Sequence, residues 1–219
     1  MSVSFQTLVK VYLPCACLII LTYIVAKVAN IHPEQLVADP NGFAKQAPYT
    51  GIVSQIGNLF WCATVTICLF CSFLISRYGE ARGKHRVVLF LLFSGLLSTL
   101  LLFDDLFLLH ENFDLILYGS SDMPRKMKNL AELVVFIVYG TLISGFIYKF
   151  WKTIFHSDFL FLLLAIVCFL LSTIVDMTPS SLSGHSIVEE GFKFLGIVSW
   201  LSYYFRFCIQ QLSKQIAST

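Results

Sequence analysis

The sequence predicts an all-α, polytopic membrane protein in which about six transmembrane helices form one bundle. Hydrophobic residues make up 57% of the 219 positions, and charged residues only 13%. The hydrophobic residues also gather into runs that approach or exceed the roughly 20 residues needed to cross a bilayer. Because six such runs with short connections occupy the whole length, we expect a single domain over residues 1–219 and no soluble domain.

Polar or turn-forming segments separate the six apolar runs. The first run lacks a small-residue cleavage site, so we interpret it as a retained span and not as a signal peptide. The cysteines fall mostly inside the runs, where we expect them to pack as small apolar side chains. The predicted spans cover about 8–28, 51–76, 87–109, 129–150, 158–175 and 187–212.

The distribution of basic residues predicts the orientation of the bundle. The loop at 77–86 carries four basic residues and one acid, which the positive-inside rule assigns to the cytoplasm. Lys149 and Lys152 then fall on the same side, as do both termini, whereas the basic residues at 125–128 fall outside. We therefore expect an integral, multi-pass protein of a plasma membrane or a prokaryotic inner membrane. The net charge of +2 gives no indication of a nucleic-acid partner.

Acidic residues lie near one end of four predicted spans. In this topology spans three and five end on the extracytoplasmic side and spans four and six begin there, so the acids meet at one side. Charged groups at membrane depth are costly and by default mark a function. Carboxylates clustered in a low-dielectric site cannot all ionise unless a cation, shared protons or neighbouring bases compensate them. The cluster comprises Asp104, Asp105, Glu111, Glu132, Asp176, Glu189 and Glu190, with His110, His185 and Lys193 as the nearby bases.

Local spacing gives these residues structural interpretations as well. Glu132 in the first turn of its span is favoured by the helix dipole, and Glu189 with Lys193 has the i,i+4 spacing of an ion pair. On an ideal helix His110 points away from Asp105. The two side chains can therefore reach one ligand only if the helix ends or bends between them.

Two spans carry polar residues at helical spacing. Gln55, Asn58, Cys62 and Thr66 share one face of span two, which we expect to face protein or a water-filled cavity. On span three the residues that share a face are Ser94, Ser98, Asp105 and Asn112. Such residues commonly join membrane helices through hydrogen bonds.

The histidines and acids on two spans resemble those of a family of membrane hydrolases. His110 lies near the end of one span with an acid close by, and His185-Ser-Ile-Val-Glu189 opens the last span. This is similar to alkaline ceramidases and adiponectin-receptor-like proteins, which bind zinc through a lone histidine and an HxxxH pair. The resemblance implies that His110 matches the lone histidine, His185 the first of the pair, and Asp105 or Asp176 the acid. Glu189 stands where the family has its second histidine, no SxxxH element precedes His110, and six spans are predicted instead of seven.

The first functional hypothesis is a zinc-dependent hydrolase acting on an amide or ester bond of a membrane lipid. A zinc ion makes its bound water acidic enough to attack such a bond near neutral pH. A second acid would orient the residues around the metal. The metal ligands would be His110, His185 and Glu189, and the acid–base and orienting residues Asp105, Glu190 and Asp176.

Two other hypotheses belong to different functional classes. The acids could bind protons or a cation in the outer vestibule of a transporter or channel, or they could hold together a non-catalytic membrane subunit. An ion path needs polar lining across the whole membrane. Since the inner halves of spans five and six are mainly Phe, Leu and Ile, the sequence favours a site that is reached from one side.

Overall fold

A computed structural model of the chain divides into two units, 1–51 and 52–219. The predicted span at 8–28 lies mostly outside the described residues. For residues 125–132, 185–186 and 215–216 the backbone alone is described. The structure describes residues 27–30, 44–47, 49–79, 83–109, 125–176 and 185–216, together with single positions between 13 and 25.

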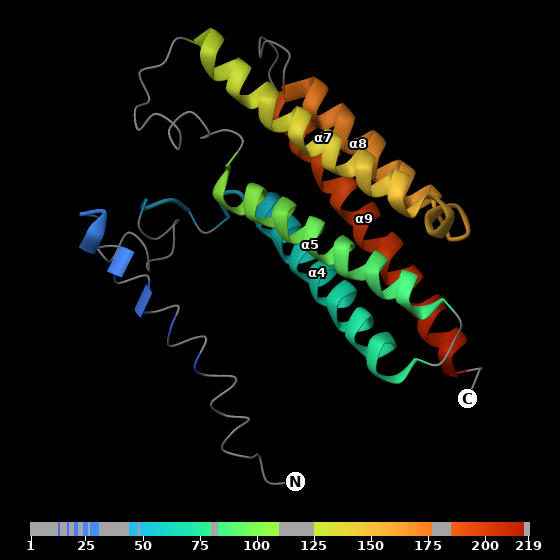
Figure 1. The fold of residues 1–219 in the computed structure, drawn as a ribbon. Coiled ribbons are helices and arrows are strands. Elements are labelled where there is room, and N and C mark those ends of the chain that lie inside the picture. The colour runs from blue at the N-terminus through green and yellow to red at the C-terminus, as the bar shows by residue number, and fades with distance from the viewer. Residues whose placement is uncertain are drawn as a thin grey trace. The chain divides into compact units, whose positions relative to one another are not determined.

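The described part of the second unit consists of five long α helices (Figure 1). No strand occurs among the described residues, which confirms the all-α class for this part of the chain. Each of the last five predicted spans coincides with one helix. The helices are α4 (Ile52–Tyr78), α5 (Lys84–Phe107), α7 (Arg125–Phe155), α8 (Leu160–Asp176) and α9 (His185–Ile216).

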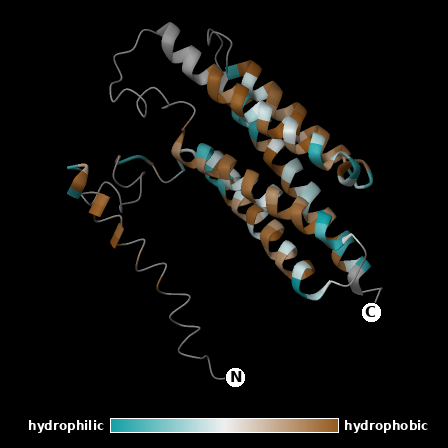
Figure 2. Ribbon diagram, in the orientation of Figure 1, coloured by the Kyte–Doolittle hydropathy of each residue, from teal (hydrophilic) through white to brown (hydrophobic). Residues whose placement is uncertain are grey.

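Three stretches of these helices are long and apolar enough to cross a membrane. They are Ile52–Tyr78, Lys84–Phe107 and Leu133–Phe155, and α8 is a shorter apolar helix. Figure 2 shows that hydrophobic residues predominate in α4, α5, α7 and α8, with hydrophilic residues mainly toward the helix ends. In α7 the helix geometry is interrupted at Phe150 (φ −108°, ψ 15°), which marks a kink near its end.

Consecutive helices run in opposite directions (Figure 1), and serine hydroxyl groups join two of the consecutive pairs. Ser72 on α4 donates a hydrogen bond to the Val88 carbonyl oxygen of α5, over 3.1 Å. Ser172 on α8 donates one to the Glu189 carbonyl oxygen of α9, over 3.0 Å. Serine is small enough to let two helices approach while it satisfies a hydrogen bond across them.

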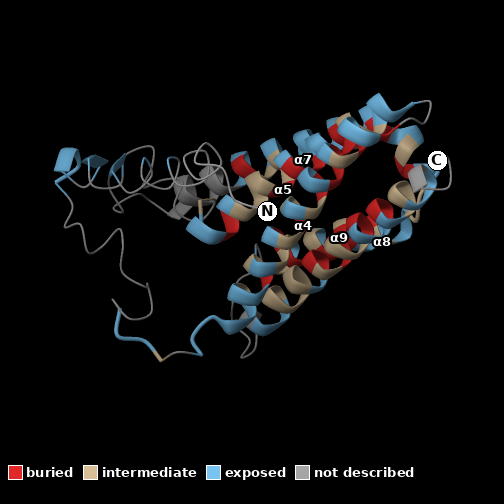
Figure 3. Cartoon of the chain, turned by 90° about the horizontal axis from the view of Figure 1, so that it is seen from below, coloured by how far each residue is buried: buried red, intermediate tan, exposed pale blue. Residues whose placement is uncertain are grey.

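Aromatic side chains fill the centre of the unit, and Figure 3 shows the buried residues on the faces that point toward neighbouring helices. Phe90 of α5 is fully buried. Its ring centroid lies 4.9 Å from that of Phe207 on α9 and 5.4 Å from that of Phe146 on α7. Because these stacked and edge-on ring pairs bury large apolar areas, they fix three helices around one point.

Small residues allow two of the helix pairs to approach closely. A Cβ atom at Gly95 of α5 would lie 2.7 Å from the Leu69 Cδ2 atom of α4. One at Gly196 of α9 would lie 2.6 Å from the Phe169 Cε1 atom of α8. Each distance is shorter than a carbon–carbon contact, so the glycine is needed for the present packing.

The polar face predicted for α4 does not point inward as expected. Three of its four members, Gln55, Cys62 and Thr66, are exposed, and only Asn58 is half-buried, whereas the packed face carries Trp61 and Cys68. The Thr66 hydroxyl donates to the Cys62 carbonyl oxygen within its own helix over 2.8 Å, so it needs no partner on another helix. The bulkier apolar side chains therefore determine which face is buried.

The described residues that the sequence places on one face of α5 lie inside the bundle. Ser94, Ser98 and Asp105 are all buried, and Asn112 lies outside the described residues. Ser98 accepts a hydrogen bond from the Trp200 Nε1–H group of α9 over 3.0 Å, so this polar face holds two helices together.

Candidate functional site

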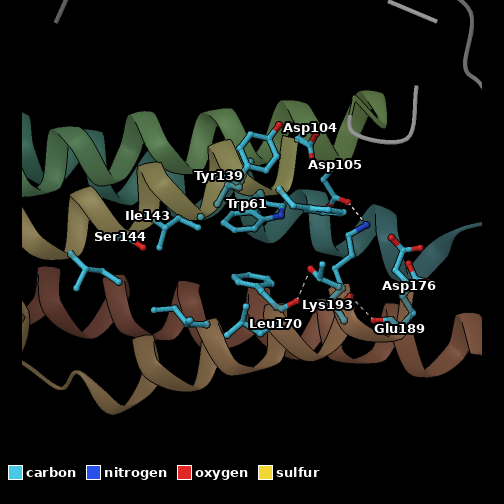
Figure 4. A pocket seen from close by; sticks show the side chains of 18 residues that line it. Trp61, Asp104, Asp105, Tyr139, Ile143, Ser144, Leu170, Asp176, Glu189 and Lys193 are labelled. Carbon is cyan, nitrogen blue, oxygen red and sulfur yellow. Dashed lines mark hydrogen bonds and ion pairs between the residues drawn. The ribbon is translucent and has the colours of Figure 1, made fainter. Parts of the chain in front are cut away.

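A cavity of about 390 Å³ lies among the five helices (Figure 4). Its volume is within the range of about 300–1,000 Å³ that is usual for small-molecule sites. Residues from every one of the five helices line it. It lies where the acidic ends of α5 and α8 meet the beginning of α9.

One end of the cavity is polar. Asp104 and Asp105 come from the last turn of α5, and Asp176 is the last residue of α8. Glu189 and Lys193 come from the first turns of α9. Figure 4 shows these side chains gathered at the same end of the cavity. Three of the four helix ends that the sequence predicted to converge, those of α5, α8 and α9, therefore surround one space.

The rest of the cavity is mainly apolar. Ile143 and Ile147 of α7 form one wall, and Ile166, Phe169 and Leu170 of α8 form another. From Tyr139 to Ile147, α7 extends for about 12 Å at 1.5 Å per residue. The space thus joins a charged end to an apolar stretch of considerable length.

Lys193 and Asp105 form an ion pair in the polar end. The Lys193 Nζ atom lies 2.5 Å from Asp105 Oδ1 and 3.5 Å from Glu190 Oε1. The Asp105 side chain is only 4% exposed, and its Oδ2 atom has no hydrogen-bond partner among the described residues. A buried carboxylate oxygen without a donor is energetically costly.

Asp104 has a partner on another helix. The Tyr139 hydroxyl of α7 donates a hydrogen bond to Asp104 Oδ1 over 2.9 Å. Asp104 is also largely buried, at 8% exposure. The two adjacent acids of α5 thus face different neighbours, one toward α7 and the other toward α9.

The end of α5 determines how these two acids are presented. Leu108 adopts a left-handed conformation (φ 50°, ψ 45°), and the Leu109 N–H group donates to the Asp104 carbonyl oxygen over 3.1 Å. This geometry is a common way for a helix to end. Because the helix ends at Phe107, the condition under which Asp105 and His110 could reach one ligand is met.

The comparisons with known proteins place the chain in a family. A model of a domain of unknown function, DUF8692, matches residues 12–207. The chain belongs to the DUF8692 family. The matched region contains every residue that lines the cavity. No curated protein and no solved structure matches the chain.

The structure places some of the predicted site residues and leaves others outside the described residues. The carboxyl groups of Asp104, Asp105, Asp176 and Glu189 line the cavity together with Lys193. Glu190 is near them through its contact with Lys193. His110 and Glu111, and the side chains of Glu132 and His185, lie outside the described residues. The catalytic and metal-binding roles assigned from the sequence stay predictions.

The partners of Lys193 differ from the local interpretation of the sequence. The i,i+4 spacing favours Glu189, but the ion pairs that the structure gives Lys193 are with Asp105 and Glu190. The i,i+3 contact to Glu190 is long, at 3.5 Å. The shorter of the two ion pairs is therefore the one with Asp105, which joins α9 to α5.

The described acids do not form a metal site by themselves. Among the described side chains no group of three or more His, Cys, Asp or Glu residues comes together to hold an ion. The Lys193 ammonium also lies against Asp105, where it supplies the positive charge that a cation would otherwise supply. A metal at this end would depend on His110 and His185.

Several lining residues were not found from the sequence. Trp61, Phe169 and Gly140 contribute to the cavity wall, and nothing in their local sequence distinguishes them from packing residues. Tyr139 had a signal, because it follows Glu132 by two helical turns on the same face of one helix. Its hydroxyl group within a long apolar stretch then needs a polar partner, which Asp104 provides.

Proposed function

We propose that this DUF8692 protein is a multi-pass membrane protein whose cavity binds a single-chain amphiphile taken from the bilayer. The observation that carries the proposal is the arrangement of the cavity, with charged groups at one end and apolar side chains along the rest. An amphiphile has the same division between head and chain. Sites of this kind bind mainly through apolar contact, while a few polar groups fix the orientation of the ligand.

The packing of α7 and α8 supports entry from the membrane. Among the described helices, α7 packs mainly against α5 and α8 packs closely against α9. The walls that α7 and α8 contribute to the cavity are therefore not sealed by close helix packing. Outside the cavity, Val138 and Leu142 of α7 and Leu163 and Val167 of α8 are exposed apolar residues suited to lipid. We propose that the ligand's chain enters between these two helices.

The proposed topology has six spans and cytoplasmic termini. It is supported by the opposite directions of α4 and α5 and of α8 and α9, and by the basic loop at 77–86, which lies at the opposite end of α5 from the acids. Peptide tags at the two ends of the chain test it in intact cells or spheroplasts. The proposal requires both tags to resist an external protease until the membrane is permeabilised. Cleavage of either tag in intact cells contradicts it.

Photolabelling with a neutral probe tests the binding proposal. Purified full-length protein in nanodiscs is irradiated with dodecanol that carries a diazirine near the end of its chain, and the labelled residues are located by mass spectrometry. We expect saturable labelling of the cavity-facing positions of α7 and α8, for example Ile143 and Leu170. An excess of unlabelled dodecanol should suppress it.

Two glycines of α7 offer a matched pair of variants. A side chain at Gly140 or Gly145 meets nothing within 4 Å, but only Gly140 lines the cavity. Gly140→Phe should fill the cavity and remove the saturable labelling, whereas Gly145→Phe should leave it unchanged. Labelling that is spread over lipid-exposed faces, or that is equal in the two variants, rules out a ligand in this cavity.

A lipid hydrolase is the second candidate function. It is favoured because Asp105, Asp176 and Glu189, which the sequence assigns to its chemistry, lie at the polar end of a cavity suited to a lipid chain. Elemental analysis of wild-type protein purified without chelators, beside His110→Ala and Glu189→Ala, tests it. Near-stoichiometric zinc that both folded variants lose supports this candidate. A wild-type protein without zinc would remove it.

A further inference from the structure

We propose that the polar end of the cavity selects a cationic head, an ammonium group on the amphiphile, with the Asp105 carboxylate as its acceptor. This inference rests on the proposed function, because it assumes that the cavity holds the alkyl chain. It specifies the chemical class of the ligand. The argument has three steps, which concern the charges at the polar end, the unsatisfied oxygen of Asp105 and the position of Lys193.

The charges that line the cavity are predominantly negative. Among the described residues that line it four are acids, namely Asp104, Asp105, Asp176 and Glu189, and one is a base, Lys193. Opposite charges within about 4–6 Å stabilise each other, whereas like charges destabilise each other. An anionic head would add a like charge to this cluster, but an ammonium group would add an opposite one.

The Asp105 carboxylate still lacks a donor. Its Oδ1 atom contacts Lys193, but its Oδ2 atom is buried and has no hydrogen-bond partner among the described residues. Nearly all buried polar atoms in proteins have a partner, so an exception needs a specific explanation. Figure 4 shows the Asp105 carboxylate at the cavity end, facing Lys193. A head group that donates hydrogen bonds would supply what is missing.

Lys193 occupies the position that we assign to the ligand's head. Its ammonium group is 2.5 Å from Asp105 Oδ1, and a second acceptor, Glu190 Oε1, is 3.5 Å away on its own helix. The Lys193 side chain is 20% exposed and can turn toward Glu190, whose side chain is 38% exposed. A ligand ammonium can then replace one cation at Asp105 by another without leaving a buried carboxylate alone.

Three ligands of equal chain length test the selection. Dodecylamine, dodecanol and dodecanoate compete with the photoreactive dodecanol probe for the full-length protein in zwitterionic nanodiscs, and competition that Gly140→Phe abolishes is counted as cavity binding. We expect dodecylamine to compete at a roughly tenfold lower concentration than dodecanol, as one charge-assisted hydrogen bond implies. Dodecanoate should be the weakest.

Variants assign the preference to Asp105. Asp105→Asn should reduce the advantage of dodecylamine over dodecanol to near unity. The double variant Asp105→Asn/Lys193→Met, which leaves a neutral pair, should do the same. Asp158→Asn is the control, because Asp158 pairs with Arg206 over 2.6 Å and does not line the cavity. It should keep the full preference.

The outcomes separate this inference from the proposal on which it rests. If none of the three ligands competes, the cavity does not bind alkyl chains and both proposals are wrong. If all three compete equally, or dodecanoate competes best, the cavity binds a chain but the cationic head is wrong. A preference for dodecylamine that persists in Asp105→Asn and in the double variant also overturns the role of Asp105.

Discussion

The Tyr139 hydroxyl on α7 donates a hydrogen bond to the Asp104 carboxylate on α5, over 2.9 Å. This bond lies at the polar end of the cavity, whereas the aromatic contacts of α7 with Phe90 lie nearer the other end of the helix. It also joins the least buried of the three long apolar stretches to the bundle, since a smaller share of residues is buried in α7 than in α4 or α5. The bond therefore holds one wall of the cavity in place.

Removing this hydroxyl should loosen α7. Tyr139→Phe takes away a hydrogen bond to a charged acceptor, which we expect to lower the free energy of unfolding by about 1.5–3 kcal/mol. Backbone hydrogen exchange should rise in α7 around residue 139 more than in α9. Tyr148→Phe is the matched control, because Tyr148 lies on the same helix and is 87% exposed. Equal effects of the two substitutions would show that the hydroxyl does not hold α7.

Gly196 should be more sensitive to substitution than Gly191 on the same helix. A Cβ atom at Gly196 would lie 2.6 Å from the Phe169 ring, whereas one at Gly191 meets nothing within 4 Å. Gly196→Ala should therefore push α8 and α9 apart and destabilise the protein by about 1–3 kcal/mol. Gly191→Ala should be neutral or stabilising by up to about 1 kcal/mol, because alanine favours helices. Thermal unfolding in detergent measures both, and a tolerated Gly196→Ala contradicts the close packing.

The hydrogen bond between Trp200 and Ser98 offers a third test. Ser98→Ala would leave the buried indole N–H group without its acceptor, at a cost of about 1–3 kcal/mol. Ser202→Ala on α9 is the control, because its hydroxyl donates only within its own helix, to the Val198 carbonyl oxygen over 2.7 Å. Thermal unfolding should separate the two variants. If Ser202→Ala lowers the stability as much as Ser98→Ala does, the hydrogen bond between α5 and α9 does not contribute specifically to stability.

The convergence of the acidic helix ends could be predicted because it depends on topology alone. Helices that alternate in direction bring the ends of α5 and α8 and the beginning of α9 to the same side, whatever the packing in between. That Ser94, Ser98 and Asp105 lie on one face of α5 also follows from helical spacing. For both predictions, the order of the spans and the spacing of residues along the chain are sufficient.

Packing decided the features that the sequence did not predict. Gln55 and Thr66 have the same helical spacing as a buried polar face, but the neighbouring face with Trp61 offers more apolar surface and is buried instead. The partner of Lys193 could not be predicted either. Spacing identifies Glu189, but the three-dimensional arrangement of α9 and α5 brings the Asp105 carboxylate within 2.5 Å of the Lys193 ammonium. Spacing rules describe contacts within one helix, so they cannot predict whether a contact between two helices will form instead.

Lys193→Met should destabilise the protein strongly, because the variant loses more than the lysine side chain itself. The substitution removes the ammonium group and leaves the Asp105 carboxylate buried, at 4% side-chain exposure, without its ion pair. Breaking a buried pair from one side costs about 3–5 kcal/mol, whereas replacing both partners with neutral groups is often nearly neutral. The double variant Asp105→Asn/Lys193→Met should therefore unfold at a temperature nearer to that of the wild type.

Ligand addition gives this prediction a second readout. A compound that binds the folded state raises its unfolding temperature, and in Lys193→Met no competing ammonium stands at Asp105. Dodecylamine should thus raise the unfolding temperature of Lys193→Met more than that of the wild type, whereas dodecanol should raise both about equally. Lys152→Met, at an exposed position of α7, controls for the loss of a positive charge. If dodecylamine stabilises the wild type and Lys193→Met equally, Lys193 does not compete with the ligand for Asp105. If Lys193→Met and Asp105→Asn/Lys193→Met unfold at the same temperature, the ion pair with Lys193 does not stabilise the buried Asp105 carboxylate.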